Sequence, residues 1–233
     1  MSDLPRVNRP SGSMAVMAQR REPPDSLDLF CTPPWATRAL VRHVLGFAGP
    51  ASETVWKPAA GYGHMAEVLR ETFTTVHASD VHDYGRGDAL GSFVGDGPDR
   101  AECPCPPDWT ITNPPYRLAE AFALRAVNEA RVGVALLLRT AWMEGLGRYA
   151  AIFRKIPPTA VAIFAERVPM VKGRWDPEAS TATAYAWFIW RHPIAAETRL
   201  TWIPPGRRES LTRPDDVRRF CMPAAVPLFE GKT

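Results

Sequence analysis

Residues 53–80 read ETVWKPAAGYGHMAEVLRETFTTVHASD, and this stretch determines the expected fold. A short apolar run predicts a strand, and the turn that follows it contains Gly61 and Gly63. A helical pattern comes next, and a second short strand ends at Asp80. Strand, helix and strand in this order predict one unit of an open α/β sheet with parallel strands.

The same alternation of strands and helices continues along the chain, and it predicts a sheet covered by helices on both faces. Residues 81–107 are rich in Gly, Pro and Asp and are expected to be mostly loop. Helices are expected over Thr32–Leu45, Met65–Thr72, Leu118–Ala130 and Met143–Phe153, and strands over Glu53–Trp56, Thr75–Ala78, Trp109–Thr112, Val132–Leu138, Ala160–Ala165 and Ala184–Trp190.

A length of 233 residues with 45% hydrophobic residues predicts one domain with arms. We expect a flexible polar arm over residues 1–25 and the folded domain over 26–195. Residues 196–233 form a basic segment rich in Pro and Arg, expected to pack on the domain or to extend from it.

Several classes of protein are excluded or disfavoured. The stretch Met1–Arg21 lacks the apolar run of a signal peptide, and no segment has the roughly 18 apolar residues of a membrane span. A cytoplasmic protein with reduced thiols, no membrane contact and no bound metal is therefore expected, and Cys103 and Cys105 are interpreted as loop residues. The net charge of +3 does not by itself indicate a nucleic-acid-binding protein.

The turn that contains Gly61 and Gly63 predicts a nucleoside site. Glycines at a strand-to-helix turn allow a ligand to approach the backbone, and the helix N-terminus is electropositive. Asp80 ends the next strand, where a carboxylate can accept hydrogen bonds from ribose hydroxyls. Ala66 stands where a dinucleotide fingerprint has its third glycine, which disfavours an NAD enzyme.

A second motif, Asn113-Pro114-Pro115-Tyr116, follows directly after an expected strand. The amide oxygen of Asn113 and the carbonyl of Pro114 could each accept a proton of an exocyclic amine, which frees the nitrogen lone pair for attack. Pro115 keeps the preceding residue extended, so the carbonyl is oriented in advance. Tyr116 offers a flat ring on which a base turned out of a duplex could stack.

With these motifs the sequence resembles the class I DNA amino-methyltransferases, especially the small phage-type adenine-N6 enzymes, over about residues 28–191. The resemblance implies a Rossmann-like, mostly parallel seven-stranded sheet whose last strand is antiparallel. It also implies methyl transfer from S-adenosyl-L-methionine to adenine N6 in DNA, with a flipped base. Asn113, Pro114, Pro115 and Tyr116 would be catalytic, and the expected cofactor-binding residues are Thr32, Pro33, Trp35, Pro58, Ala59, Gly61, Gly63, Asp80, Asp88 and Asn113.

Lys57 is the main departure from this family, which usually has an acid before the proline of the glycine loop. A lysine that points into the site would repel the positive amine of the cofactor and weaken or abolish activity. One that points away would have little effect.

The nucleic-acid contacts are expected in two basic segments, since phosphates are bound by Lys and Arg. The residues expected to make these contacts are Lys172, Arg174, Trp175, Arg207 and Arg208.

Three alternatives keep the chemistry and change the substrate: RNA adenine, cytosine N4, or a protein glutamine. Only 57 residues precede Pro58, too few for the N-terminal domain typical of the glutamine enzymes. Cytosine-N4 enzymes commonly have Ser in place of Asn113. A fourth alternative is a nucleic-acid-binding protein with this fold and little or no turnover, which Lys57 keeps open.

Overall fold

The computed structural model describes residues 28–221, so the arm expected over 1–25 lies outside the described residues. No helix in the described range is long and apolar enough to cross a membrane. The strands are β1 (Ala51–Pro58), β2 (Phe73–Asp80), β3 (Ala89–Leu90), β4 (Trp109–Thr112), β5 (Gly133–Arg139), β6 (Ala160–Phe164), β7 (Tyr185–Arg191) and β8 (Arg199–Ile203).

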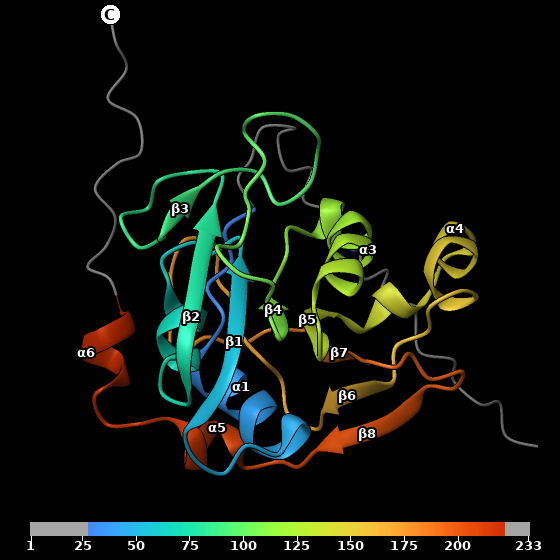
Figure 1. Cartoon of the computed structure of the whole chain (residues 1–233). Helices are drawn as coiled ribbons and strands as arrows, with labels where there is room; N and C mark the ends of the chain where they lie inside the picture. Colours follow the sequence, from blue (N-terminus) through green and yellow to red (C-terminus); the bar gives the residue numbers. More distant parts are fainter. Residues whose placement is uncertain (1–27, 222–233) are drawn as a thin grey trace, which may run out of the picture.

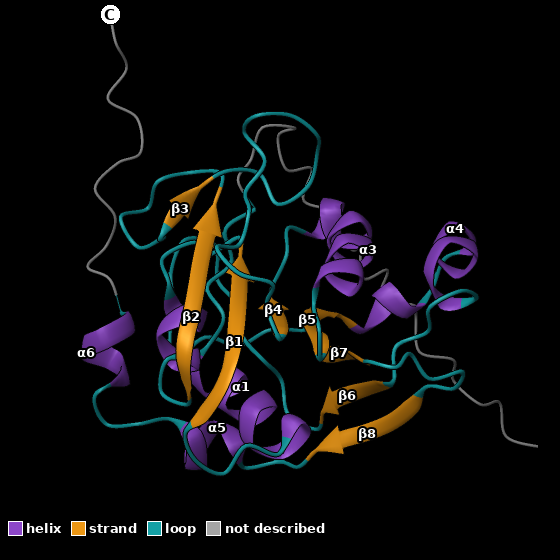
Figure 2. Cartoon of the chain, viewed as in Figure 1, coloured by secondary structure: helices purple, strands orange, loops and turns teal. Residues whose placement is uncertain are grey.

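These strands form one twisted sheet in the order β3-β2-β1-β4-β5-β7-β6-β8 (Figures 1 and 2). Strand β7 runs antiparallel to its neighbours β5 and β6. All other neighbouring pairs are parallel. The expected, mostly parallel sheet is thus confirmed, and the antiparallel strand is the seventh in chain order, as expected.

The sheet has eight strands, so the expected number of seven is wrong by one. Strand β8 follows residue 195, where the folded domain was expected to end, and it pairs with β6 over its whole length. In β8 the apolar residues Leu200 and Trp202 are 48% and 63% exposed. The strand therefore lacks the alternation of buried apolar and exposed polar residues by which a strand is recognised in a sequence. The short β3 lies within residues 81–107, which are otherwise mostly loop as expected.

The four expected helices are present with shorter or interrupted geometry, and two further helices follow β8. The expected helix Met143–Phe153 is interrupted at Gly145, whose φ of 126° lies outside the helical region. The helices are α1 (Pro34–Ala39, continued by π-helical turns over Leu40–Leu45), α2 (His64–Leu69), α3 (Ala119–Glu129), α4 (Leu146–Arg148, continued by a π-helical turn over Tyr149–Phe153), α5 (Arg207–Leu211) and α6 (Asp216–Phe220), with 3₁₀ turns at Tyr116–Leu118 and Thr140–Met143.

Two apolar cores lie on the two faces of the sheet. One joins α1 and α5 to the sheet through residues such as Trp35, Leu211 and Ile111. The other joins α3 to the opposite face through residues such as Phe122 and Leu136. Alternate residues of β5 belong to different cores, which explains why the strand is a nearly continuous apolar run.

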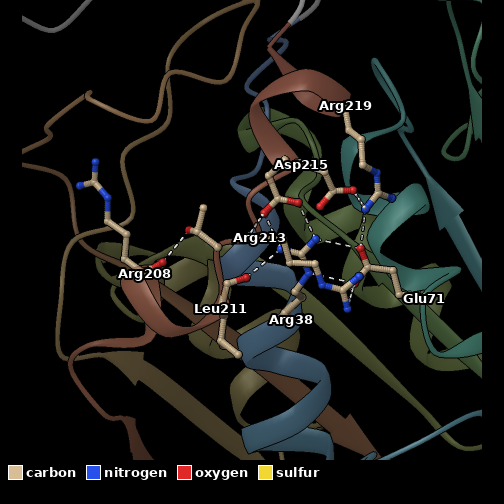
Figure 3. Close-up of polar contacts among 9 residues, drawn as sticks. Arg38, Glu71, Arg208, Leu211, Arg213, Asp215 and Arg219 are labelled. Carbon is tan, nitrogen blue, oxygen red and sulfur yellow. Dashed lines mark hydrogen bonds and ion pairs between the residues drawn. The ribbon is translucent and has the colours of Figure 1, made fainter.

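The side chain of Arg38, in α1, is 3% exposed and links the C-terminal helices α5 and α6 to the rest of the domain (Figure 3). Its guanidinium donates two hydrogen bonds to the Asp216 carboxylate of α6, at 2.6 and 2.7 Å. It donates two more to Glu71, both at 2.8 Å, and one to the carbonyl of Leu211 at 2.7 Å. Arg213 and Arg219 also contact Glu71, at 2.9 and 3.0 Å.

Burial opposes ionisation of the acids in this network, but Arg38 outweighs it. Desolvation would raise the pKa of Glu71 and Asp216, whereas the hydrogen bonds and charge of Arg38 lower both values below their usual range. The network therefore holds α5 and α6 through fully ionised groups at neutral pH.

Candidate active site

An open cavity of about 810 Å³ lies where β1, β2 and β4 end. Parallel strands bring their carboxyl ends to one edge, which is where ligands bind in open α/β sheets. The arrowheads of β1 and β2 in Figure 1 point toward this edge. Of the residues expected to bind the cofactor, the cavity is lined by Thr32, Ala59, Gly61, Asp80 and Asn113.

The turn after β1 forms one side of the cavity. Gly61 and Gly63 have φ values of 56° and 77°, a region that favours glycine, and Ala59 has a φ of 52°. A side chain at position 61 would also meet Leu29, because a Cβ there would lie 2.7 Å from its Cδ1 atom. The turn therefore depends on glycine at Gly61 for both conformation and space.

Asp80 connects this turn to the end of β2. Its Oδ2 atom accepts a hydrogen bond from the Gly61 amide at 2.8 Å, and its Oδ1 atom accepts one from the His82 amide at 3.1 Å. Each carboxylate oxygen has a second lone pair, so Asp80 can hold the turn and still accept from a ligand in the cavity.

Lys57 lies behind the turn and is 2% exposed. Its Nζ atom donates to the carbonyls of Pro58, at 2.9 Å, and Ala59, and to the Thr112 hydroxyl at 3.1 Å. Burial lowers the pKa of Lys57 to about 7, and the nearby charge of Asp80 opposes this shift. The side chain thus borders the cavity, and its ammonium group is directed at oxygen atoms of the protein.

Asn113 has a fixed orientation at the end of β4. Its Nδ2 atom donates to the carbonyl of Phe30 at 3.1 Å and to the Thr32 hydroxyl at 3.2 Å, and it contacts the sulfur of Met170 at 3.6 Å. A carbonyl can only accept, so the amide nitrogen must face Phe30. The Oδ1 atom then points away from these partners.

The rest of the Asn-Pro-Pro-Tyr motif is held by neighbouring residues. Asp28 accepts a hydrogen bond from the Tyr116 amide at 2.8 Å. The Tyr116 hydroxyl donates to that of Tyr185 at 2.9 Å, and the guanidinium of Arg139 lies 4.2 Å from the Tyr116 ring centre. Burial raises the pKa of Tyr116 above its usual range, so the phenol stays neutral. Pro115 lines the cavity, and the neighbouring Pro114 is buried.

The expected cofactor-binding residues that do not line the cavity contribute to the core or to the sheet. Trp35 is 2% exposed and packs edge-to-face against Phe164 at 5.5 Å, because α1 directs it into the core. Asp88 accepts a hydrogen bond from the Ala78 amide at 2.7 Å and thereby supports β2. The residues that do not line the cavity are Pro33, which precedes α1, Trp35, Pro58, Gly63 and Asp88.

Part of the cavity wall was not expected from the sequence. Apolar residues from the loop after β3 and from α3 complete the wall, and these segments are distant in sequence from the glycine turn. The only signal for them was their aromatic and apolar character within a region interpreted as loop or helix. The additional lining residues include Tyr84, Phe93, Val94 and Phe122.

His64 also lines the cavity and is 5% exposed. Its Nδ1 atom has no hydrogen-bond partner among the described residues. Burial, and then the charge of Arg86, lower its pKa to about 4. His64 is therefore a neutral member of the wall at physiological pH.

The residues expected to bind nucleic acid have different environments. Trp175 is 4% exposed and packs against Phe220 of α6, so in this structure it is a core residue and does not present its ring to a nucleic acid. Arg208 donates to the carbonyl of Pro177, and its backbone amide donates to Glu166 at 2.8 Å. It thus joins α5 to residues 165–184, the connection between β6 and β7.

The remaining members of that set differ in exposure. Lys172 and Arg174 are exposed in the connection between β6 and β7, and Arg174 pairs with Asp176 at 3.3 Å. Arg207 is half-buried at the start of α5. Met170, in the same connection as Lys172, touches Asn113, so this connection borders the cavity.

No group of three His, Cys, Asp or Glu side chains within residues 28–221 is arranged to hold a metal ion. All four cysteines, Cys31, Cys103, Cys105 and Cys221, have free thiols.

The strand order and the reversed β7 define a Rossmann-like class I methyltransferase fold, and comparison with solved structures agrees. The chain is similar to the methyltransferase subunit of a type I restriction-modification system from Streptococcus thermophilus, with a TM-score of 0.55 and 11% sequence identity. The similarity covers 78% of this chain and 52% of that subunit, so this chain spans about half the length of the subunit.

Two further structures are less similar. They are a dimethyladenosine transferase from Plasmodium falciparum (TM-score 0.43, 12% identity, 69% of this chain and 62% of that chain) and the 23S rRNA methyltransferase ErmE (TM-score 0.44, 12% identity, 72% of each chain). At these scores neither similarity bears on the function of this chain. No protein-family model matches the sequence, and no curated protein matches it.

Proposed function

We propose that this protein transfers a methyl group from S-adenosyl-L-methionine to the exocyclic N6 amine of adenine in DNA. The observation that carries the proposal is the orientation of Asn113, whose amide nitrogen is fixed by Phe30 and Thr32. The amide oxygen is therefore available to an incoming amine at the cavity that Asn113 lines.

The residues present fit the proposed cofactor. When bound, S-adenosyl-L-methionine supplies a methyl group carried by a positively charged sulfonium. The carboxylates of Asp28 and Asp80 line the cavity and offset the charge of Lys57 beside it. Asp80 would accept from the ribose hydroxyls, and the apolar wall that includes Phe93 and Phe122 would cover the adenine ring.

The protein activates the amine with hydrogen-bond acceptors. The lone pair of an adenine amine is delocalised into its ring, so the nitrogen is a poor nucleophile. Acceptance of its two protons by Asn113 Oδ1 and the Pro114 carbonyl favours a tetrahedral nitrogen with a localised lone pair. Asn113 is held in place before the substrate arrives, which is the arrangement that stabilises a transition state most effectively.

The surroundings of the motif support a base in a nucleic acid as the substrate. Tyr116 provides an aromatic ring next to the acceptors, and stacking on such a ring stabilises a base taken out of a duplex. Arg139 adds exposed positive charge next to this ring, and Lys172 adds exposed positive charge in the connection that borders the cavity. A phosphate backbone would pass along these charges. DNA is proposed on the resemblance of the motif to adenine-N6 enzymes.

A methyl-transfer assay tests the proposal directly. The protein is incubated with tritiated S-adenosyl-L-methionine and, separately, with unmethylated DNA, RNA and protein, and the labelled products are digested and identified. We expect label in N6-methyladenine from DNA. The Asn113→Ala variant should lose about 10²–10³-fold in kcat, the typical effect of removing one preorganised polar group.

A matched control is Asn128→Ala, an exposed asparagine on α3, which should keep full activity. Label in RNA adenine, cytosine N4 or glutamine would replace the proposed substrate and retain the chemistry. Cofactor binding without transfer to any substrate would instead identify a nucleic-acid-binding protein with this fold.

A further inference from the structure

Lys57 forms a buried connection between two strand ends at the cavity. It belongs to β1, and the Thr112 hydroxyl it contacts belongs to β4. The other two acceptors are the carbonyls of Pro58 and Ala59, at the start of the glycine turn. One side chain thus joins three oxygen atoms from the two segments that flank the cavity.

The three acceptors match the ammonium form of the side chain. An ammonium group has three N–H donors and no acceptor. The Thr112 hydroxyl donates its own proton to the Pro58 carbonyl at 2.5 Å, so toward Lys57 its oxygen acts as an acceptor. A neutral amine would direct its lone pair at one of these oxygens. The charged form is therefore the one that satisfies every group present.

The glycine turn needs such a connection because its conformation is otherwise unfavourable. Ala59 has a positive φ of 52°, which is strained for a residue with a Cβ atom. Its carbonyl and that of Pro58 converge on one point, where two partial negative charges would repel each other without a cation. Asp80 fixes the other end of the turn through the Gly61 amide.

We infer that Lys57 is a positioning residue whose ammonium group holds the Pro58 and Ala59 carbonyls against Thr112 and so sets the glycine turn for the nucleoside ligand. The inference rests on the proposed function only for the identity of that ligand. Lys57 would thus increase the affinity for the cofactor. A lysine that pointed into the site was expected to decrease this affinity by repulsion. Lys57 thus acts through the backbone of the turn.

The test combines ligand affinity with the stability of the ligand-free protein. Calorimetric titration with S-adenosylhomocysteine, which lacks the sulfonium charge, is performed at pH 6.0 so that Lys57 is protonated. We expect Lys57→Met to bind at least about tenfold more weakly, about 1.4 kcal/mol. Its melting temperature without ligand should fall, because the Pro58 and Ala59 carbonyls lose their buried donor, so binding is compared at a temperature at which both proteins are folded.

Two threonines on β4 provide a matched pair. Thr112→Val removes one partner of Lys57 and should weaken binding about threefold, with no further loss when it is combined with Lys57→Met. Thr110→Val is the control, since Thr110 is equally buried and its hydroxyl has no partner among the described residues. It should bind as the wild type does.

The KM for S-adenosyl-L-methionine should rise in Lys57→Met while kcat at saturating cofactor stays near the wild-type value, because the turn is altered and Asn113 is not. Should Lys57→Met fail to fold, Lys57→Gln serves as the neutral variant with the same expectation. Unchanged or tighter binding by the folded neutral variant would overturn the inference and leave the proposed function intact. Absence of binding by the wild type would instead overturn the proposed function.

Discussion

Asp80 contributes to the site in two ways, and its variants can separate them. One contribution is the hydrogen bond that its Oδ2 atom accepts from the Gly61 amide. The other is a negative charge facing the cavity, where ribose hydroxyls would be bound. An asparagine can retain the first contribution and lacks the second, and an alanine lacks both.

We predict that Asp80→Asn weakens S-adenosylhomocysteine binding by about tenfold or more, since a charge-assisted hydrogen bond contributes about 1.5–3 kcal/mol. Its melting temperature should fall slightly, because the amide nitrogen of an asparagine cannot accept the exposed hydrogen bond from His82. Asp80→Ala should bind at least as weakly and also melt at a lower temperature, because the Gly61 amide loses its partner. Calorimetric titration and thermal unfolding measure the two effects, with the exposed Asp96→Asn as control. Equal melting temperatures for both variants would contradict the structural contribution.

At the scale of single elements, the two short helices α5 and α6 depend on tertiary contacts. Each has five residues, too few for a helix that is stable alone. Arg38 supplies the fixed point, since Asp216 is fully buried and has the guanidinium as its counterion. Phe220 of α6 in turn packs on His64 at 5.3 Å and on Trp175, so α6 supports the wall of the cavity.

We predict that Arg38→Met lowers the free energy of unfolding by about 3–5 kcal/mol, because it leaves the buried carboxylate of Asp216 without its ion-pair partner. The control is Arg70→Met, which breaks a surface pair with Glu67 and should cost less than about 1 kcal/mol. Denaturant titration at pH 7 measures both. A loss below 1 kcal/mol for Arg38→Met would show that the network does not hold the helices.

The same network makes the free energy of unfolding depend on pH in the acidic range. Glu71 and Asp216 have a lower pKa in the folded protein than in the unfolded chain, so their contribution is fully present above the unfolded value of about 4. It is lost as the pH falls through their lower folded values. The difference in stability between the wild type and Arg38→Met should therefore shrink as the pH is lowered below 4.

At the scale of the whole molecule, the cavity connects elements from both faces of the sheet. Its lining comes from the ends of β1 and β2, from residues that follow β3 and β4, from the segment before α1, and from α2 and α3. A ligand bound there contacts elements on both faces and should stabilise the folded state as one unit. Ligand binding can therefore be observed as a shift in global unfolding.

S-adenosylhomocysteine at one hundred times its Kd should raise the free energy of unfolding by about 2.7 kcal/mol. For a domain of this size each kcal/mol corresponds to roughly 2–4 °C, so the melting temperature should rise by about 5–11 °C. Scanning calorimetry with increasing ligand tests this, with adenine alone as the control compound. No shift at any concentration would contradict a nucleoside site in this cavity.

Local patterns predicted most of the sheet and the centre of the site. The apolar runs at β1, β2, β4 and β5 and the glycine turn are short-range signals, because strand periodicity and turn chemistry depend on neighbouring residues. Asn113 and Asp80 could then be placed because parallel strands bring their ends together.

Features that depend on distant contacts could not be predicted. Arg38 and Asp216 are 178 positions apart, and nothing local to either residue indicates the other. The burial of Trp175 by Phe220 could not be predicted, because it depends on how α6 packs against a segment 45 positions earlier in the chain. The orientation of Lys57 likewise depends on Thr112, which lies 55 positions further along the chain.

Because β7 is antiparallel to β6, the segments on the two sides of Asn113 come from separate parts of the chain. Since β6 ends at the cavity edge and β7 returns from it, the hairpin of residues 165–184 overhangs Asn113 from one side, while the glycine turn and Asp80 face it from the other. Under the proposed function, choice of target and affinity for the donor would reside in separate pieces of chain, with both ends of the hairpin anchored in adjacent strands. Insertions or exchanges in that hairpin could redirect the protein to a new target while leaving the donor side untouched.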